Sequence, residues 1–157
     1  MNAHGSIVSG VRHPLSGEFS LRAVNEADGE EILIKKNLVV NNFYTQLAYL
    51  LSGDTTSRNI DRIAFGSGSA TPVEGNTNIT HLVPPVWLTA TVTYPTIYSV
   101  RFTAVWAQAV QNTNPVTEAG LFFAGSTGLA ARVTFQSMRK STGWTWTIQW
   151  TLAYAVD

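Results

Sequence analysis

The last stretch of the chain constrains the fold more than any other part of the sequence. From Trp144 to Tyr154 it reads WTWTIQWTLAY, so that apolar and polar residues alternate strictly. This alternation predicts a β-strand with one buried side and one solvent-facing side. At about 3.3 Å per residue the strand would be roughly 33 Å long, and it needs strands beside it and an apolar layer above it. We expect these residues to form the core: Phe102, Trp146, Ile148, Trp150 and Leu152.

Other alternating runs supply the neighbouring strands. Two of them flank Asp28-Gly29, a dipeptide typical of tight turns, and are expected to form a hairpin. Two further hairpins are expected, one from residues 88–94 and 98–106 and one from residues 116–123 and 129–135.

One segment has a helical period instead. Phe43, Leu47 and Leu50 follow a spacing of four and three residues, which predicts an amphipathic helix over residues 41–51. We expect Asn41 or Asn42 to cap its start and Gly53 to end it. The helix should cover one open side or end of the β structure.

About eight strands and a single short helix predict an all-β protein, a two-sheet β-sandwich of jelly-roll-like type. At 157 residues one domain is expected. Residues 17–157 are assigned to that domain. Residues 1–16 have no sustained period and are interpreted as an N-terminal arm, in which Arg12 and His13 are candidate protein contacts.

The composition argues against several classes of partner. Only 13% of the residues are charged and the formal net charge is zero, so we expect no nucleic acid to be attracted by bulk charge. No apolar run reaches the length of a membrane span, so no membrane is expected either. The absence of cysteine removes disulfides and thiolate metal sites, and fits assembly in a reducing cytosol.

No arrangement of residues typical of catalysis is present. His4, His13 and His81 are isolated from one another in the sequence, and no nucleophile motif surrounds a serine. We therefore expect a protein that is not an enzyme and holds no cofactor or metal. Glu118 stands before an apolar run, and we expect it to form a structural ion pair with a strand arginine. Arg101 and Arg132 are both candidates, and Arg132 is the preferred partner.

Three tryptophans fall near the ends of expected strands, where a side chain can be exposed. Trp87, Trp106 and Trp144 are therefore candidate contact residues, either for a protein partner or for a sugar ring stacked on the indole.

Several of these segments, taken together, resemble virion structural proteins of tailed bacteriophages. The resemblance rests on residues 37–41 (NLVVN), on the leucine-rich helix with its Ser52-Gly53 end, and on residues 60–69 (IDRIAFGSGS). It continues through residues 117–122 (TEAGLF), 129–135 (LAARVTF) and 150–152 (WTL), and so covers most of the chain.

The resemblance implies a structural role in a virion assembled in the bacterial cytoplasm. A small single-domain chain without a shaft or repeat fits a capsid cement (decoration) protein, whose partners would be the major capsid protein and other copies of itself, as a dimer or trimer. The alternative is a structural or receptor- or glycan-recognition module associated with the tail, baseplate or fibre.

Overall fold

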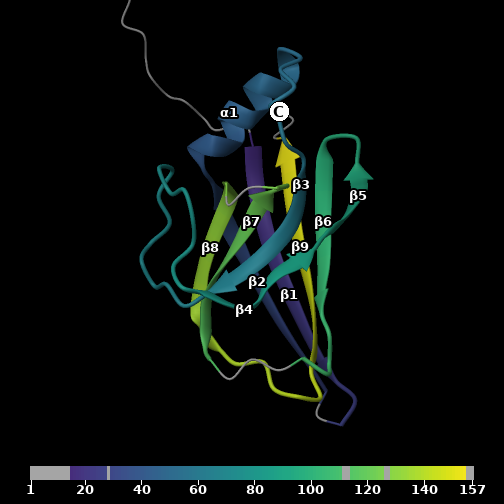
Figure 1. Ribbon diagram of the computed structural model, residues 1–157. Helices are drawn as coiled ribbons and strands as arrows, with labels where there is room; N and C mark the ends of the chain where they lie inside the picture. Colours follow the sequence, from purple (N-terminus) through teal and green to yellow (C-terminus); the bar gives the residue numbers. More distant parts are fainter. Residues whose placement is uncertain (1–14, 28, 111–113, 126–127, 155–157) are drawn as a thin grey trace, which may run out of the picture.

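The computed structural model describes residues 15–27, 29–110, 114–125 and 128–154, which form nine strands and one helix (Figure 1). In chain order the elements are β1 (Leu15–Asn25), β2 (Gly29–Val39), α1 (Asn41–Leu51), β3 (Ile60–Gly66), β4 (Leu82–Thr89), β5 (Thr91–Thr96), β6 (Ser99–Trp106), β7 (Val116–Phe123), β8 (Leu129–Met138) and β9 (Thr145–Tyr154). The expected all-β class with one short helix is confirmed, with one strand more than the sequence indicated.

All strand pairs are antiparallel, in the order β4-β3-β7-β8-β2-β1-β9-β6-β5. The sheet folds over into two layers that share β2. Along Gly29–Asn37 this strand pairs with β1, whereas only Leu38 and Val39 pair with β8. On the other side, β3 and β4 lie against β6. The result is a β-sandwich whose two sheets are joined through β2 at Leu38 and Val39 and separate toward Gly29.

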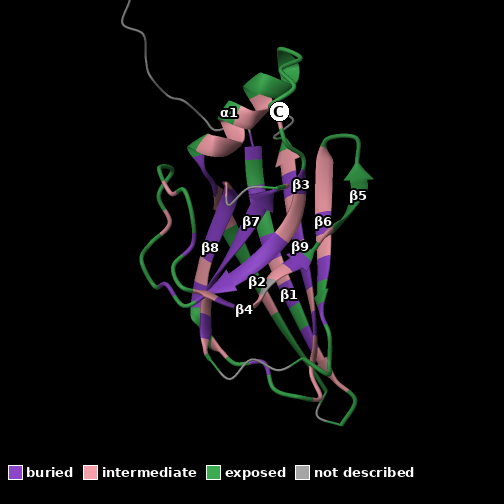
Figure 2. Ribbon diagram, viewed as in Figure 1, coloured by how far each residue is buried: buried purple, intermediate pink, exposed green. Residues whose placement is uncertain are grey.

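The C-terminal strand β9 is central in its sheet, between β1 and β6. The expected core residues Phe102, Trp146, Ile148, Trp150 and Leu152 are all buried. Figure 2 shows the buried stretches of the strands in purple. Aromatic rings of the two sheets pack against each other. The ring centroid of Phe65 in β3 lies 5.8 Å from that of Trp146 in the opposite sheet, in an edge-to-face arrangement. Such edge-to-face pairs contribute about 0.5–1.5 kcal/mol each beyond the burial itself.

Helix α1 lies across one end of the sandwich and has the predicted bounds (Figure 1). Its C-terminal end is as expected. Gly53 has a φ of +73°, and the amides of Gly53 and Asp54 donate to the carbonyls of Leu50 and Tyr49 at 3.2 and 2.9 Å.

The expected asparagine cap of α1 is wrong. The N-cap residue is Val40, which has extended backbone and makes no side-chain capping bond. Asn41 and Asn42 lie one and two residues too late to cap, inside the first turn. Asn42 instead donates from Nδ2 to the carbonyl of Leu129 at 3.1 Å, which ties the helix to β8.

The boundary of the arm also needs correction. Leu15 and Ser16 were assigned to the arm, but they are the first two residues of β1 and pair with Tyr154 and Ala153 of β9. Leu15 is buried. The sequence hides this start because Gly17, the next inward position, has no side chain to mark the alternation. Residues 1–14, with Arg12 and His13, lie outside the described residues.

Candidate interaction surface

Glu118 and Arg132 come together as a buried ion pair between the neighbouring strands β7 and β8. The Nε of Arg132 lies 2.7 Å from Oε2 of Glu118. The other carboxylate oxygen, Oε1, accepts hydrogen bonds from the amides of Gly68 and Thr80 at 2.8 and 2.6 Å. Both oxygens of Glu118 are thus engaged, and the pair holds the two ends of the long loop between β3 and β4.

The arginine secures the middle of the same loop. Arg132 donates from Nη1 to Oδ1 of Asn76 at 2.8 Å, and that oxygen also accepts the amide of Val73 at 3.0 Å. A hydrogen bond also connects this loop to the start of α1, because the carbonyl of Glu74 accepts the amide of Asn41 at 2.8 Å. A buried charge pair therefore determines the shape of a surface loop, which is a structural role.

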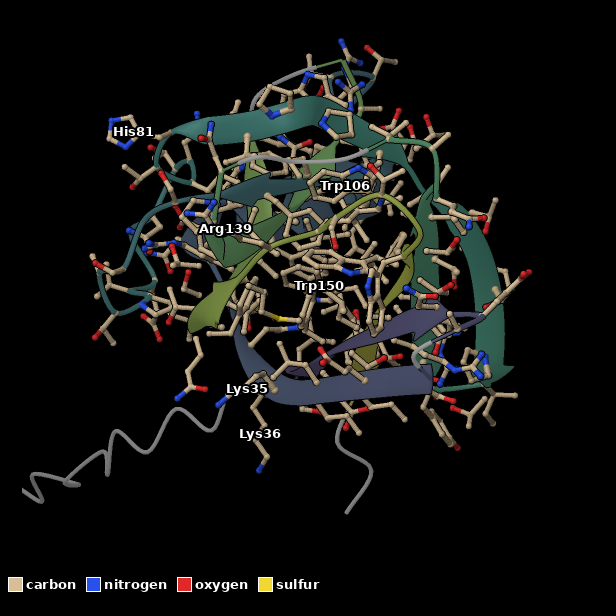
Figure 3. The ribbon with its side chains drawn as sticks, turned by 90° about the horizontal axis from the view of Figure 1, so that it is seen from below. Lys35, Lys36, His81, Trp106, Arg139 and Trp150 are labelled. Carbon is tan, nitrogen blue, oxygen red and sulfur yellow. The ribbon has the colours of Figure 1, made fainter. Side chains whose placement is uncertain are left out.

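Trp106 is not a contact residue, contrary to the expectation from its position near a strand end. It is 1% exposed and lies among the side chains between the two sheets (Figure 3). It stands opposite Trp146 in the β6–β9 register, with ring centroids 5.4 Å apart. The reason is its parity, since Phe102, Ala104 and Trp106 share one face of β6 and that face is buried.

Trp87 and Trp144 are half-buried and retain part of their surface. Trp87 packs edge-on against Phe122 with ring centroids 5.0 Å apart, and the guanidinium of Arg62 lies 5.2 Å from the centre of its ring. Its indole is therefore committed to internal contacts, and Trp144 is the better candidate for an external ligand.

Trp144 lines a polar cleft of about 330 Å³ at the end of the sandwich opposite α1, where β2 and β8 have separated. Glu31, Ser137 and Arg139 also line this cleft and offer hydrogen-bonding groups beside an indole. That combination of a flat aromatic surface and polar groups is suited to a small polar ligand.

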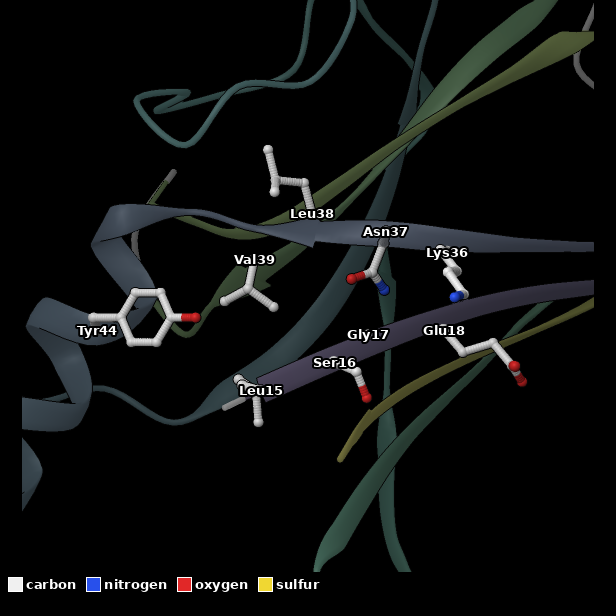
Figure 4. Close-up of a pocket in the computed structure, with 9 residues that line it drawn as sticks. All are labelled: Leu15, Ser16, Gly17, Glu18, Lys36, Asn37, Leu38, Val39 and Tyr44. Carbon is white, nitrogen blue, oxygen red and sulfur yellow. The ribbon is translucent and has the colours of Figure 1, made fainter. Parts of the chain in front are cut away.

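A second hollow, of about 240 Å³, lies where β1 and β2 approach α1 (Figure 4). Asn37 points across it toward Gly17, its partner in the β1–β2 register, and a Cβ at Gly17 would collide with the Asn37 carboxamide. Both amide atoms of Asn37 are buried without a partner among the described residues. Tyr44 also lines this hollow, and its burial, together with the nearby charge of Glu74, raises the pKa of its phenol.

A group of exposed apolar side chains lies at the end of the sandwich that carries α1. We call it the apolar end and define it by five exposed side chains: Leu50, Tyr94, Ile97, Tyr98 and Tyr154. The amide of Tyr154 donates to the carbonyl of Tyr98 at 2.9 Å, so β9 and the β5–β6 turn meet there. Ile97 is 89% exposed, which is a large apolar area to leave in water.

Phe43 of α1 divides the apolar end into two shallow hollows. One, of about 160 Å³, lies between the helix and β3 and is lined by Leu47, Leu50 and Ile60 among others. The other, of about 210 Å³, lies between the helix and the β5–β6 turn and is lined by Tyr94, Ile97 and Tyr98 among others. Both are smaller than typical small-molecule pockets and suit side chains of a protein partner.

Local sequence patterns did not predict the apolar end, because residues 88–94 and 98–106 were expected only as the two strands of a hairpin. One signal was present: an isoleucine and two tyrosines stand beside the turn of this hairpin, where polar residues are usual.

Among the described residues, no three or more histidine or acidic side chains come together as a set that could hold a metal ion. In the same part of the chain, no helix is both long and apolar enough to cross a membrane.

Comparison with known proteins finds no matching family model, no similar curated protein and no similar solved structure.

Proposed function

We propose that this chain is a virion structural protein of a tailed bacteriophage that binds and reinforces the capsid lattice, as a cement protein does. Its partners would be the major capsid protein and other copies of itself. The sequence resemblance suggests the setting, and the apolar end is the observation that supports a binding role. Five exposed apolar or aromatic side chains lie together there at one end of the sandwich.

The chemistry of the apolar end fits a protein partner. Interface cores are rich in tyrosine and aliphatic side chains and poor in charge, and the apolar end has the same character. Among the described residues, Arg58 is the one charged side chain that lines either hollow. The strands that carry the apolar end are hydrogen-bonded to one another, because β6 pairs with β5 on one side and with β9 on the other.

The mechanism would be linkage between binding and assembly. A protein that binds the assembled lattice more tightly than free capsid subunits stabilises the lattice by that difference in affinity. No chemical step is required, and the isolated domain needs only to be rigid and to present the apolar end.

A binding assay with separated virion parts tests this proposal. Purified protein is mixed with heads or tails of the phage that encodes it, each prepared without this protein, and sedimented. The wild-type chain should sediment with heads, in amounts comparable to the major capsid protein. Ile97→Asp and Leu50→Asp should remain in the supernatant, because each places a charge on the apolar end.

Val105→Asp is the matched control, since Val105 is also exposed but lies at the end of β6 away from the β5–β6 turn. It should sediment like the wild type. Sedimentation with tails alone, or equal loss for Val105→Asp and Ile97→Asp, would contradict the capsid role of the apolar end.

The cleft beside Trp144 favours one alternative, a tail-, baseplate- or fibre-associated module that recognises a receptor or glycan. An indole next to Glu31, Ser137 and Arg139 could stack a sugar ring and bind its hydroxyl groups. In a glycan-array assay this alternative predicts a signal that Trp144→Ala abolishes and Ile97→Asp preserves. An array with no signal from the wild-type chain would remove its basis.

A further inference from the structure

Strand β2 has a long free edge. Its residues Gly29–Asn37 pair with β1 on one side, and on the other side β8 pairs only with Leu38 and Val39. In the described part of the chain no strand covers the remaining edge, so its outward backbone groups have no ladder partner. Proteins usually guard such an edge, because it can pair with another chain.

The side chains along this edge are exposed to solvent. From Gly29 to Lys36 every described residue is exposed except Leu33, which is half-buried against the core. Ile32 and Ile34 are 63% and 60% exposed on the outer face of the sheet. Exposure of two neighbouring isoleucine side chains on one face of an unpaired edge strand is unfavourable in water and unusual for a strand edge that stays uncovered.

The sequence of the edge is antisymmetric in charge about its centre. Residues 30–36 read EEILIKK, with two glutamates before Leu33 and two lysines after it. If two copies of β2 pair antiparallel with Leu33 opposite Leu33, Glu30 faces Lys36 and Glu31 faces Lys35 of the other copy. Ile32 then faces Ile34, so that apolar meets apolar and each carboxylate meets an ammonium.

We infer that a second copy of this chain docks on the free edge of β2, forming a twofold dimer in which the two β2 strands pair antiparallel about Leu33. A twofold contact of this kind uses the same surface on both copies. The layer β2-β1-β9-β6-β5 of one copy would join the same layer of the other copy into one continuous sheet. The exposed isoleucines of the two copies would pack against each other where the two β2 strands meet. This inference concerns β2 and does not depend on the proposed capsid role.

The faces of the strands agree with this pairing. Glu30, Ile32, Ile34 and Lys36 share the outer face of the sheet, while Glu31, Leu33 and Lys35 share the inner face. Lys35 and Lys36 project from the ribbon of β2 in different directions (Figure 3). In an antiparallel pair, residues directly opposite one another lie on the same face, so each proposed contact is geometrically allowed.

The same charges disfavour other registers. If Ile34 instead of Leu33 lies opposite its own copy, Lys36 faces Ile32 of the other strand. If Ile32 lies opposite its own copy, Glu30 faces Ile34. Parallel pairing would bring glutamates beside glutamates and lysines beside lysines, which is repulsive. Glu30 already pairs with Arg22 on the outer face at 2.6 Å, so Glu31 and Lys35 are the cleaner positions to test.

Sedimentation velocity of the full chain is the first test. From micromolar to millimolar concentration the wild type should pass reversibly from monomer to dimer, and added salt should weaken the dimer because exposed ion pairs are screened. A chain that stays monomeric over this whole range would overturn the inference.

A charge exchange is the decisive test. Glu31→Lys alone and Lys35→Glu alone each place like charges opposite one another twice per dimer, and should weaken self-association by about tenfold or more. Mixed in equal amounts, the two variants should form a heterodimer of near wild-type affinity, because every lysine then faces a glutamate. Failure of the mixture to exceed the separate variants would overturn the pairing.

Glu26→Lys is the matched control, since it makes the same charge change in the turn of this hairpin, outside the ladder. It should dimerise like the wild type, as should Ile97→Asp at the apolar end. If Ile97→Asp abolishes the dimer while Glu31→Lys leaves it intact, the copies meet at the apolar end and the inference fails.

Hydrogen exchange tests the wild type without any substitution. Amides within Gly29–Lys36 should exchange more slowly at dimer-forming concentration than at high dilution. Those of β5, the exposed strand at the far edge of the same sheet, should not change. Equal behaviour of the two edges would contradict pairing through β2.

Discussion

The guanidinium of Arg132 and the carboxylate of Glu118 meet at 2.7 Å where only 3% of the arginine side chain, and none of the glutamate side chain, is exposed. Removal of one partner from such a pair leaves an unpaired buried charge. Glu118→Ala should therefore lower the free energy of unfolding by about 3–5 kcal/mol, as measured by urea denaturation.

The same substitution should free the loop that Glu118 holds. The amides of Gly68 and Thr80 should exchange with solvent faster, because their acceptor is gone. Glu118→Gln should have an intermediate effect, since it keeps a carbonyl acceptor but loses the charge. Glu30→Gln, in the exposed pair with Arg22, serves as the control and should change little. Equal losses for Glu30→Gln and Glu118→Ala would contradict this account.

Trp106 should behave as a core residue. Trp106→Ala should cost about 3–5 kcal/mol of unfolding free energy, because it leaves a large cavity beside Phe65 and Trp146. Trp106→Phe should cost much less, since Nε1 of Trp106 has no hydrogen-bond partner among the described residues. Trp144→Ala, at a half-buried position, should also cost less. A Trp106→Ala chain as stable as the wild type would show that the ring is not part of the core.

The buried Lys140 should make the free energy of unfolding depend on pH in the alkaline range. It is 1% exposed, donates to the carbonyl of Val110 and lies 5.7 Å from the ring centre of Trp106. Burial lowers the pKa of Lys140 below its ordinary value of 10.5. Between the lowered pKa and 10.5 the unfolded chain binds this proton more strongly than the folded chain does, so the cost of burying the charge is relieved as the pH rises.

The measurement is the unfolding free energy of the wild type minus that of Lys140→Met as a function of pH. This difference should increase through the alkaline window and level off near 10.5. The subtraction removes the titration of Tyr44 and of other groups common to both chains. A difference that stays constant across the window would mean that the burial of Lys140 carries no linked proton.

Two truncations should separate the arm from the first strand. A chain that lacks residues 1–14 keeps every described strand, whereas a chain that lacks residues 1–16 also loses Leu15, which is buried and pairs with Tyr154. The longer truncation should reduce the unfolding free energy by about 1–3 kcal/mol relative to the shorter one. Equal thermal midpoints for the two truncations would contradict the assignment of Leu15 to β1.

Local patterns predicted the elements well where one side of a segment is buried. The alternation in β9 and the helical spacing in α1 located both elements, and Gly53 marked the helix end. These signals are local because periodicity reports which residues of one segment share a face. The candidate contact residues were harder to predict. Trp106 has the same parity as Phe102 and Ala104, but whether the last residue of a strand is covered depends on neighbours distant in sequence, here Trp146 and Phe65.

The strand order and the free edge of β2 were beyond a local reading. Nothing within residues 29–39 shows that β8 meets this strand at Leu38 and Val39 alone. The charge pattern of residues 30–36 was visible from the start, but it has no meaning until one knows that this edge is unpaired. The apolar end was missed for a similar reason, since it is assembled from α1, the β5–β6 turn and the end of β9.

The pairing of β1 with β9 brings Leu15 beside Tyr154, so the first and last described residues are neighbours. A short linker could join them without disturbing any ladder, and new chain ends could be opened at an exposed turn such as that near Gly125. The contacts of the sandwich would be kept in such a circular permutant, because they depend on which strands lie side by side and not on the order of the strands along the chain.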